Sequence, residues 1–290
     1  MSQATRPRRS VLYMPGANAR ALDKARTLPA DALILDLEDA VAPAAKEQAR
    51  RQVVAALAAG GYGRRELAVR LNGLDTPWGA DDVAAIARSG FDAVVLPKVE
   101  SAGMLADLRH RLTAAGAPAV LPLWAMIETP RGVLKVAEIA QSPGLACLVI
   151  GTSDLTKELR ARHTAGRLPL LTALGLCLLA ARAHGLAILD GVHLDIQDAQ
   201  GFAEACRQGA ELGFDGKTLI HPAQIEAANA AFGPSADAVA EARRILAAFA
   251  VAEAEGKGVA LLDGRLIENL HVAEARRTLA LAQAMDALGS

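Results

Sequence analysis

Residues 31–59 read DALILDLEDAVAPAAKEQARRQVVAALAA, an apolar run that ends in acidic residues and leads into a helical pattern. The apolar run is short and continuous, which is typical of a parallel strand that is buried on both faces. After the acids, apolar residues recur at the spacing of an amphipathic helix. The stretch therefore predicts one strand–helix unit, with Asp36, Glu38 and Asp39 where the strand ends.

The same unit recurs along most of the chain. Strand candidates alternate with helical segments, and they lie at 10–16, 31–39, 66–73, 92–100, 122–129, 145–155, 186–195 and 216–222. Eight units with continuously apolar strands predict an α/β fold of the (β/α)8 TIM-barrel type. A doubly wound open sheet is the alternative, but no G-x-G-x-x-G follows the first strand.

The pattern changes after about residue 233. A long helix is predicted over 236–255, followed by a hairpin-like stretch and a last helix that ends near residue 287. We therefore predict a (β/α)8 catalytic domain at 1–232. Residues 233–290 would form a C-terminal helical arm or lid.

Composition and charge restrict the class of protein. The chain has 290 residues, 52% of them hydrophobic, which is enough for one barrel with a small appendage. A net charge of −1 with scattered basic residues argues against a nucleic-acid partner. The apolar run after residues 5–9 is too short for a secretory signal, and the longest one, at 170–181, is too short to span a bilayer. We expect a cytoplasmic protein without a membrane partner.

Polar side chains close the predicted strands. They are Glu38, Asp39, Arg70, Asn72, Lys98, Glu128, Asp154, Asp190, His193 and His221. In a (β/α)8 barrel the carboxyl ends of all strands meet at the face that carries the active site. Each residue alone also fits a structural role, such as a helix cap or an ion pair between Arg70 and Glu38. Together, carboxylates crowded at one rim repel one another unless a cation lies among them, which favours a divalent metal site.

Magnesium is the metal that this set of residues favours. The six histidines show no H-x-x-x-H or His/Cys cluster of the kind that zinc prefers. Carboxylates that leave positions for water and substrate oxygens suit a hard octahedral ion, and Mn²⁺ is the alternative. Cys147, Cys177 and Cys206 are far apart in apolar settings, which predicts reduced core thiols and no disulfide.

Several short motifs follow one another along the chain, and they are SVLYMPG, LDLEDAV, VRLNG, LPKVE, IET, GTSDL and DGKTLIHPAQI. In order and spacing they resemble those of the citrate lyase beta subunit and malyl-CoA lyase family, over residues 10 to about 285. HpcH/HpaI-type pyruvate aldolases share part of the set. The resemblance implies a magnesium-dependent (β/α)8 enzyme that forms or cleaves a carbon–carbon bond between an acyl-CoA and a 2-oxo acid.

The resemblance also implies roles for individual residues. Glu128 and Asp154 would bind Mg²⁺ directly. Arg70 would hold the thioester enolate or a substrate oxygen. Glu38 and Asp39 would orient a water on the metal.

Two further residues are assigned to binding of the substrate or CoA. Lys98, which closes the fourth predicted strand, would pair with the acidic ligands or reach a CoA phosphate. Asn72, which closes the third, would contact the substrate. The small-molecule partners would therefore be a CoA thioester and a 2-oxo acid.

One position departs from the family pattern. In the lyases of this family an Asp in a C-terminal G-x-M-I-D motif reaches into a neighbouring subunit's site as an acid or base, whereas residues 264–268 here read GRLIE. Glu268 carries one more methylene, and a misplacement of about 1 Å can cost about a hundredfold in rate. Alternatively, Glu268 is an acid favoured by the dipole of the last helix.

Three functions follow from the resemblance. The first is a Mg²⁺-dependent lyase that acts on a 3-hydroxyacyl-CoA such as malyl-CoA or citramalyl-CoA. The second is a malyl-CoA thioesterase, a hydrolase that uses the same site, because the segment LDGRLIENLH resembles the corresponding segment of family members with this activity. The third is a beta subunit of a multi-subunit citrate lyase. The first two imply a homo-oligomer, either a trimer or a hexamer.

Overall fold

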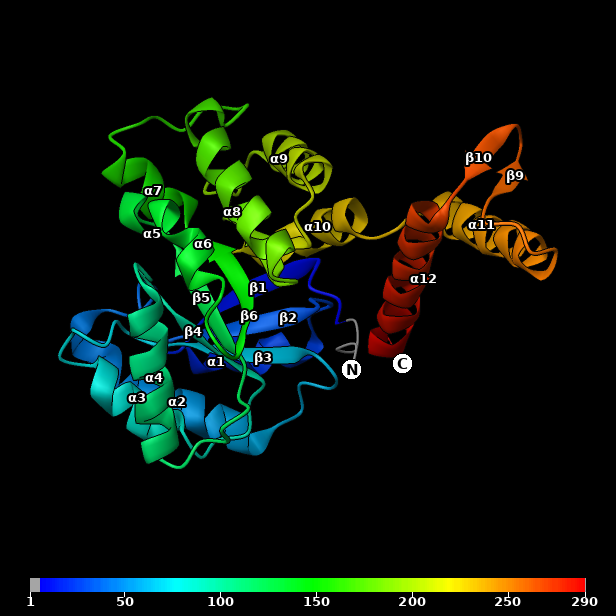
Figure 1. Cartoon of the computed structure of the whole chain (residues 1–290). Coiled ribbons are helices and arrows are strands. Elements are labelled where there is room, and N and C mark those ends of the chain that lie inside the picture. The colour runs from blue at the N-terminus through cyan, green and yellow to red at the C-terminus, as the bar shows by residue number, and fades with distance from the viewer. Residues whose placement is uncertain (1–5, 290) are drawn as a thin grey trace. The chain divides into compact units, whose positions relative to one another are not determined.

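The computed structural model describes residues 6–289, which divide into two compact units (Figure 1). Residues 8–232 form one unit, and residues 233–289 belong to the other. Among the described residues, every helix is too short or too polar to cross a bilayer.

The first unit is a closed barrel of parallel strands in the order of the sequence. The strands are β1 (Ser10–Pro15), β2 (Ala32–Asp36), β3 (Glu66–Arg70), β4 (Ala93–Leu96), β5 (Leu123–Ile127), β6 (Leu145–Ile150), β7 (Ala187–Asp190) and β8 (Gly216–Leu219). Each strand lies inside one predicted range, so the prediction of a (β/α)8 barrel is confirmed.

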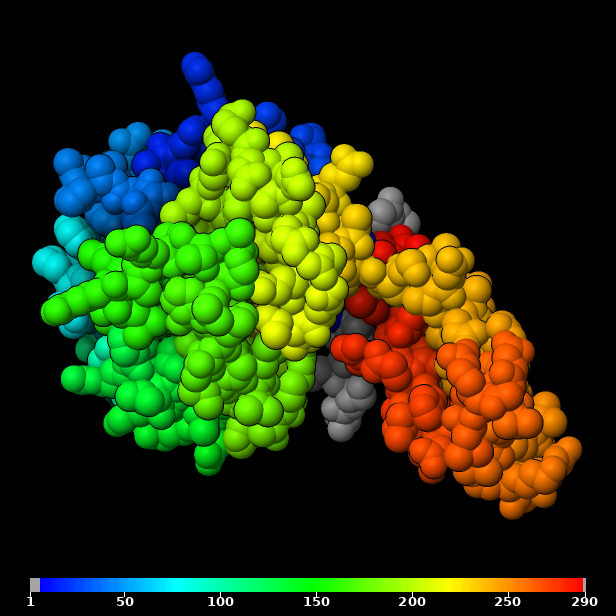
Figure 2. Space-filling model, turned by 90° about the horizontal axis from the view of Figure 1, so that it is seen from above, coloured from blue at the N-terminus to red at the C-terminus, as the bar shows by residue number. Residues whose placement is uncertain are grey.

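Helices cover the outside of the barrel. They are α1 (Ala19–Lys24), α2 (Lys46–Ala59), α3 (Gly79–Ile86), α4 (Ala102–Ala114), α5 (Pro130–Leu134), α6 (Val136–Ile139), α7 (Thr152–Glu158), α8 (Leu171–Ala183), α9 (Ala199–Leu212) and α10 (Ile225–Phe232). Short 3-10 segments occur at η1 (Ala25–Thr27), η2 (Pro43–Ala45), η3 (Leu168–Leu170) and η4 (Pro222–Gln224). On the face drawn in Figure 2, the helices coloured green to yellow-green form a continuous layer of side chains.

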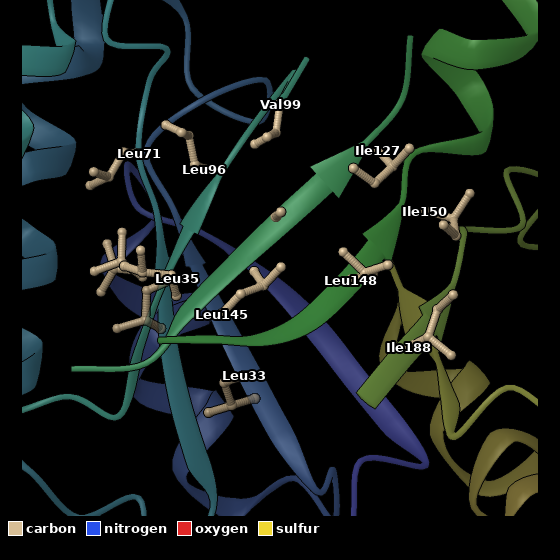
Figure 3. Packing of buried hydrophobic residues seen from close by; sticks show 14 of the residues in the cluster. Leu33, Leu35, Leu71, Leu96, Val99, Ile127, Leu145, Leu148, Ile150 and Ile188 are labelled. Atoms are coloured by element: carbon tan, nitrogen blue, oxygen red, sulfur yellow. The ribbon is translucent and has the colours of Figure 1, made fainter. Parts of the chain in front are cut away.

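Alternate residues of each strand enter two different hydrophobic clusters. In β2, Leu33 and Leu35 pack in the cluster that contains helix residues, between the strands and the helices (Figure 3). Ala32 and Ile34 belong to a second cluster that contains strand residues alone, and therefore point into the barrel. This period of two also turns Asp36, the last residue of β2, toward the inside.

The second unit has its own small core. It consists of α11 (Ala236–Ala254), the antiparallel strands β9 (Ala260–Leu262) and β10 (Arg265–Ile267), and α12 (Asn269–Gly289). Phe249, Ile267 and Val272 are among its buried residues. The helix–hairpin–helix order agrees with the sequence pattern, while the role of this unit as an arm or lid stays a prediction.

All three cysteines are buried, and their thiols are free. Burial raises the pKa of Cys177 to about 12 and that of Cys206 to about 11. Burial also raises the pKa of Cys147, which lies inside the barrel. These thiols therefore behave as core side chains.

Candidate active site

The first component of the site is a fixed cation. The register of β2 and β3 places Asp36 beside Arg70. Arg70 donates through Nε and Nη2 to the two carboxylate oxygens of Asp36, at 2.7 and 2.6 Å. Its guanidinium also lies over the ring of Tyr13, 4.7 Å from the centroid. Burial opposes the charge, but Asp36 raises the pKa of Arg70 well above its usual value, so Arg70 stays a cation.

Glu38 lies on the other side of this guanidinium. Arg70 Nη1 is 2.8 Å from Glu38 Oε2 and 3.5 Å from Asp39 Oδ2. Lys98 Nζ donates to Glu38 Oε1 at 3.0 Å. Lys46 donates to two backbone carbonyls of the loop, including that of Glu38, and thereby holds the loop in place. Burial raises the pKa of Glu38 despite the nearby Arg70, which makes its carboxylate a stronger base.

Glu128 and Asp154 face one cavity of about 320 Å³, which Asp36, Asp39 and Arg70 also line. Glu128 directly follows β5, and Asp154 lies in the first turn of α7, after β6. Burial and the charge of Glu38 raise the pKa of Glu128 to about 7. A carboxylate with such a pKa needs a nearby positive charge to remain ionised.

The donor set of this cavity fits a magnesium ion. Mg²⁺ keeps several waters and binds proteins through one or two carboxylates, which Glu128 and Asp154 supply. No cluster of three or more His, Cys, Asp or Glu side chains arranged for a metal occurs in the described part of the chain. Water and substrate oxygens would therefore complete the coordination. Glu38 Oε2 is buried, and within residues 6–289 it forms an ion pair with Arg70 Nη1.

Lys98 contacts Glu38, Glu128 and Asp154. Its backbone N–H donates to Glu128 Oε1 at 2.8 Å, and its Nζ lies 3.9 Å from Asp154 Oδ2. Lys98 and Glu38 line a different cavity, of about 630 Å³, and are not among the residues that line the cavity of Glu128. Of the two roles predicted for Lys98, pairing with the acids agrees with these contacts. Its role toward CoA stays a prediction.

Asn72 and Glu268 do not line the cavity of Glu128. The Asn72 side chain is buried, and its amide donates to the carbonyl of Leu37 and to the carboxylate of Asp82. Asn72 thus supports the loop after β2, and its contact with the substrate stays a prediction. Glu268 belongs to the second unit, where it is exposed and immediately precedes α12.

The remaining strand-end residues serve the local structure. Asp190 is buried and accepts hydrogen bonds from Lys217 Nζ at 2.9 Å and Arg167 Nη1 at 2.7 Å. His221 Nδ1 accepts from a backbone N–H in the turn that opens η4. The side chain of His193 packs edge-on against Phe202. None of these three residues lines the cavity of Glu128.

Sequence reasoning missed two side chains of the site. Tyr13 from β1 and Asp36 from β2 both line the cavity and contact Arg70. The spacing along β2 could have shown this, because Ala32, Ile34 and Asp36 alternate with the outward-facing residues and all three point into the barrel. The sequence alone does not tell which residues of β2 point inward, because both faces of the strand are apolar.

Comparison with known proteins supplies the remaining findings. Residues 9–222 match the family model described as HpcH/HpaI aldolase/citrate lyase. The chain is 53% identical to a (3S)-malyl-CoA thioesterase of Cereibacter sphaeroides over 287 residues, which cover 99% of each chain. It is 38% identical to citrate lyase subunit beta of Escherichia coli over 285 residues, 96% of this chain and 94% of that one. The protein CitE of Mycobacterium tuberculosis, in complex with magnesium, acetoacetate and coenzyme A, has a TM-score of 0.77 and 34% identity, with 94% and 97% of the two chains covered.

Proposed function

Because the chain belongs to the HpcH/HpaI aldolase/citrate lyase family of enzymes, we propose that it is a thioesterase that hydrolyses malyl-CoA. The observation that carries this proposal is the 53% identity to (3S)-malyl-CoA thioesterase over 99% of both chains. Citrate lyase subunit beta is more distant, at 38%. The lyase reading of the sequence keeps the same family and the same site, but the comparisons support the hydrolase alternative better.

Glu128 and Asp154 would hold Mg²⁺ in the cavity that they share. When bound, the ion would act as a Lewis acid toward the hydroxyl and carboxylate oxygens of the malyl group. The presence of magnesium and coenzyme A in the related CitE structure supports this assignment. Mn²⁺ would be an adequate replacement, since it accepts the same oxygen ligands.

The chain's own residues would carry the hydrolysis. A water forms a bond to the thioester carbon, the C–S bond breaks, and CoA leaves as its thiol. Arg70, which two acids hold rigidly, would stabilise the negative charge that develops on the thioester oxygen. Glu38, with its raised pKa, would take the proton from the water, and Asp39 would help to orient that water.

The lyase remains the second candidate, for a specific reason. Structures of the citrate lyase beta subunit of M. tuberculosis, 35% identical to this chain, contain oxaloacetate or pyruvate with magnesium. Both are 2-oxo acids, the class of product that carbon–carbon cleavage releases. A subunit of a multi-protein citrate lyase is the third candidate. It differs from the other two because it would be inactive on free CoA esters.

One assay separates these candidates. The protein is incubated with (S)-malyl-CoA and Mg²⁺, and glyoxylate, malate and free thiol are measured in the same tube, with EDTA in a control. We expect thiol and malate without glyoxylate. Glyoxylate without thiol would overturn the hydrolase and favour the lyase. No product from the free ester, but activity on a carrier-bound one, would favour the subunit.

Size measurement in solution complements this assay. We propose a homo-oligomer, a trimer or hexamer, in which Glu268 contributes to the activity. Gel filtration of an active preparation would test this state. An active monomer would overturn it.

A further inference from the structure

Glu128 lies between the ends of two neighbouring strands, and a backbone segment at each end contacts or accommodates its carboxylate. The register of β5 and β6 pairs Ile127 with Ile150, so the next residues, Glu128 and Gly151, lie side by side. On the other side, the N–H of Val99 donates to the carbonyl of Met126, which brings the end of β4 against that of β5. Val99, Ile127 and Ile150 lie at the same end of their strands in Figure 3.

Gly151 leaves the space that the Glu128 carboxylate occupies. A Cβ atom built on Gly151 would overlap both Oε2 and Cβ of Glu128 and would lie 3.1 Å from its Cδ. The backbone of Gly151, with φ of −92°, is one that any residue can adopt. The absence of a side chain is therefore required by Glu128 and not by the local backbone conformation.

Lys98 fixes the other oxygen of the same carboxylate. Its backbone N–H donates to Glu128 Oε1 at 2.8 Å. Lys98 makes this contact from a left-handed conformation, with φ of 50°, which residues with a side chain rarely adopt. Among residues 6–289, Oε2 of Glu128 accepts no hydrogen bond, so this oxygen remains free for a ligand in the cavity.

We propose that Gly151 and Lys98 are positioning residues that aim one oxygen of Glu128 at a metal ion in the cavity. Lys98 holds Oε1 through its backbone, and Gly151 leaves room for Oε2. The inference rests on the proposed function, because it takes Glu128 as a metal ligand. It adds that the geometry of this ligand comes from the backbones of the two flanking strands.

Mg²⁺ affinity, measured by isothermal titration calorimetry, tests the part that Gly151 plays. In Gly151→Ala the new methyl group displaces Oε2, and we expect the affinity to fall by about tenfold or more, the usual effect of losing support around a ligand. Gly175→Ala is the matched control, since a Cβ at Gly175 meets nothing within 4 Å. Circular dichroism follows the fold of both variants.

Two substitutions at Lys98 keep the proposal testable even if Gly151→Ala fails to fold. Lys98→Gly and Lys98→Ala both remove the ammonium, so they differ only in how readily they hold the left-handed backbone. We expect Lys98→Gly to bind Mg²⁺ several-fold more tightly than Lys98→Ala, because only glycine keeps the N–H aimed at Glu128 without strain.

The outcomes separate this inference from the proposed function. Wild-type affinity in Gly151→Ala, or equal affinities in the two Lys98 variants, would overturn the positioning role and leave the thioesterase proposal intact. A wild-type protein that binds no Mg²⁺ would overturn both.

Discussion

The pair of Asp36 and Arg70 offers the sharpest test of how the site is built. Asp36 is fully buried and accepts four hydrogen bonds, two from Arg70 and one each from the backbone N–H groups of Glu38 and Ala40. In Asp36→Asn the negative charge is lost, and one carboxylate oxygen becomes an amide that faces an arginine donor. Removing one partner of a buried ion pair costs about 3–5 kcal/mol. Because whole proteins are stable by about 5–15 kcal/mol, the loss is a large fraction of the total.

Urea unfolding followed by circular dichroism measures this cost. We expect a lower midpoint for Asp36→Asn and for Arg70→Met. The double variant Asp36→Asn/Arg70→Met should lose less than the sum of the two single changes, with a coupling energy of about 2 kcal/mol or more, because it removes both charges of the buried pair. Thioesterase activity should be lost in all three, since each one removes or displaces the guanidinium.

Two results would refute this reasoning. One is an Asp36→Asn protein whose free energy of unfolding lies within about 0.5 kcal/mol of the wild type, the effect of an ordinary surface substitution. The other is an additive double variant. Either result would mean that Arg70 does not depend on Asp36 for its charge or its position.

Three further predictions concern the metal and the second unit. Glu128→Ala and Asp154→Ala should lose Mg²⁺-dependent activity and keep the circular dichroism of the wild type; full activity in either would contradict the metal assignment. The pKa of Glu128, raised to about 7, means that a proton competes with the metal below pH 7. Mg²⁺ affinity measured by calorimetry should therefore fall by about fivefold between pH 7 and pH 6 and change little above pH 8; a constant affinity across this range would exclude Glu128 as the competing group. Glu268→Asp should raise the ratio of glyoxylate to thiol in the malyl-CoA assay, with Glu255→Asp, on the same unit, as a control; an unchanged ratio would show that the side-chain length at this position does not decide the reaction.

Much of the fold was readable because the strands have a simple signature. Runs such as ALIL in β2 are short, apolar and followed by polar residues, and the strand candidates alternate with amphipathic helices. The same property hid part of the site, since a strand that is apolar on both faces does not reveal which residues point inward. Asp36 was therefore recognised as a strand-end acid but not as the partner of Arg70.

Other features depend on contacts between distant parts of the chain. The hydrogen bonds of Asn72 to Asp82 and to the carbonyl of Leu37 support the loop after β2, and they could not be read from the sequence. The sequence does not predict the left-handed backbone of Lys98, because lysine rarely adopts this conformation. The relation of Gly151 to Glu128 arises only when β5 and β6 pair in their observed register.

The three buried thiols allow both the reaction and the opening of the fold to be followed with a thiol reagent. Folding keeps each cysteine thiol protonated and buried. A chromogenic thiol reagent added to the native enzyme would therefore react with CoA released by hydrolysis and hardly at all with the protein's cysteines. In the absence of substrate, the same reagent would label a cysteine only when the barrel opens. The slow appearance of colour would then time the spontaneous opening of this fold, without an added label.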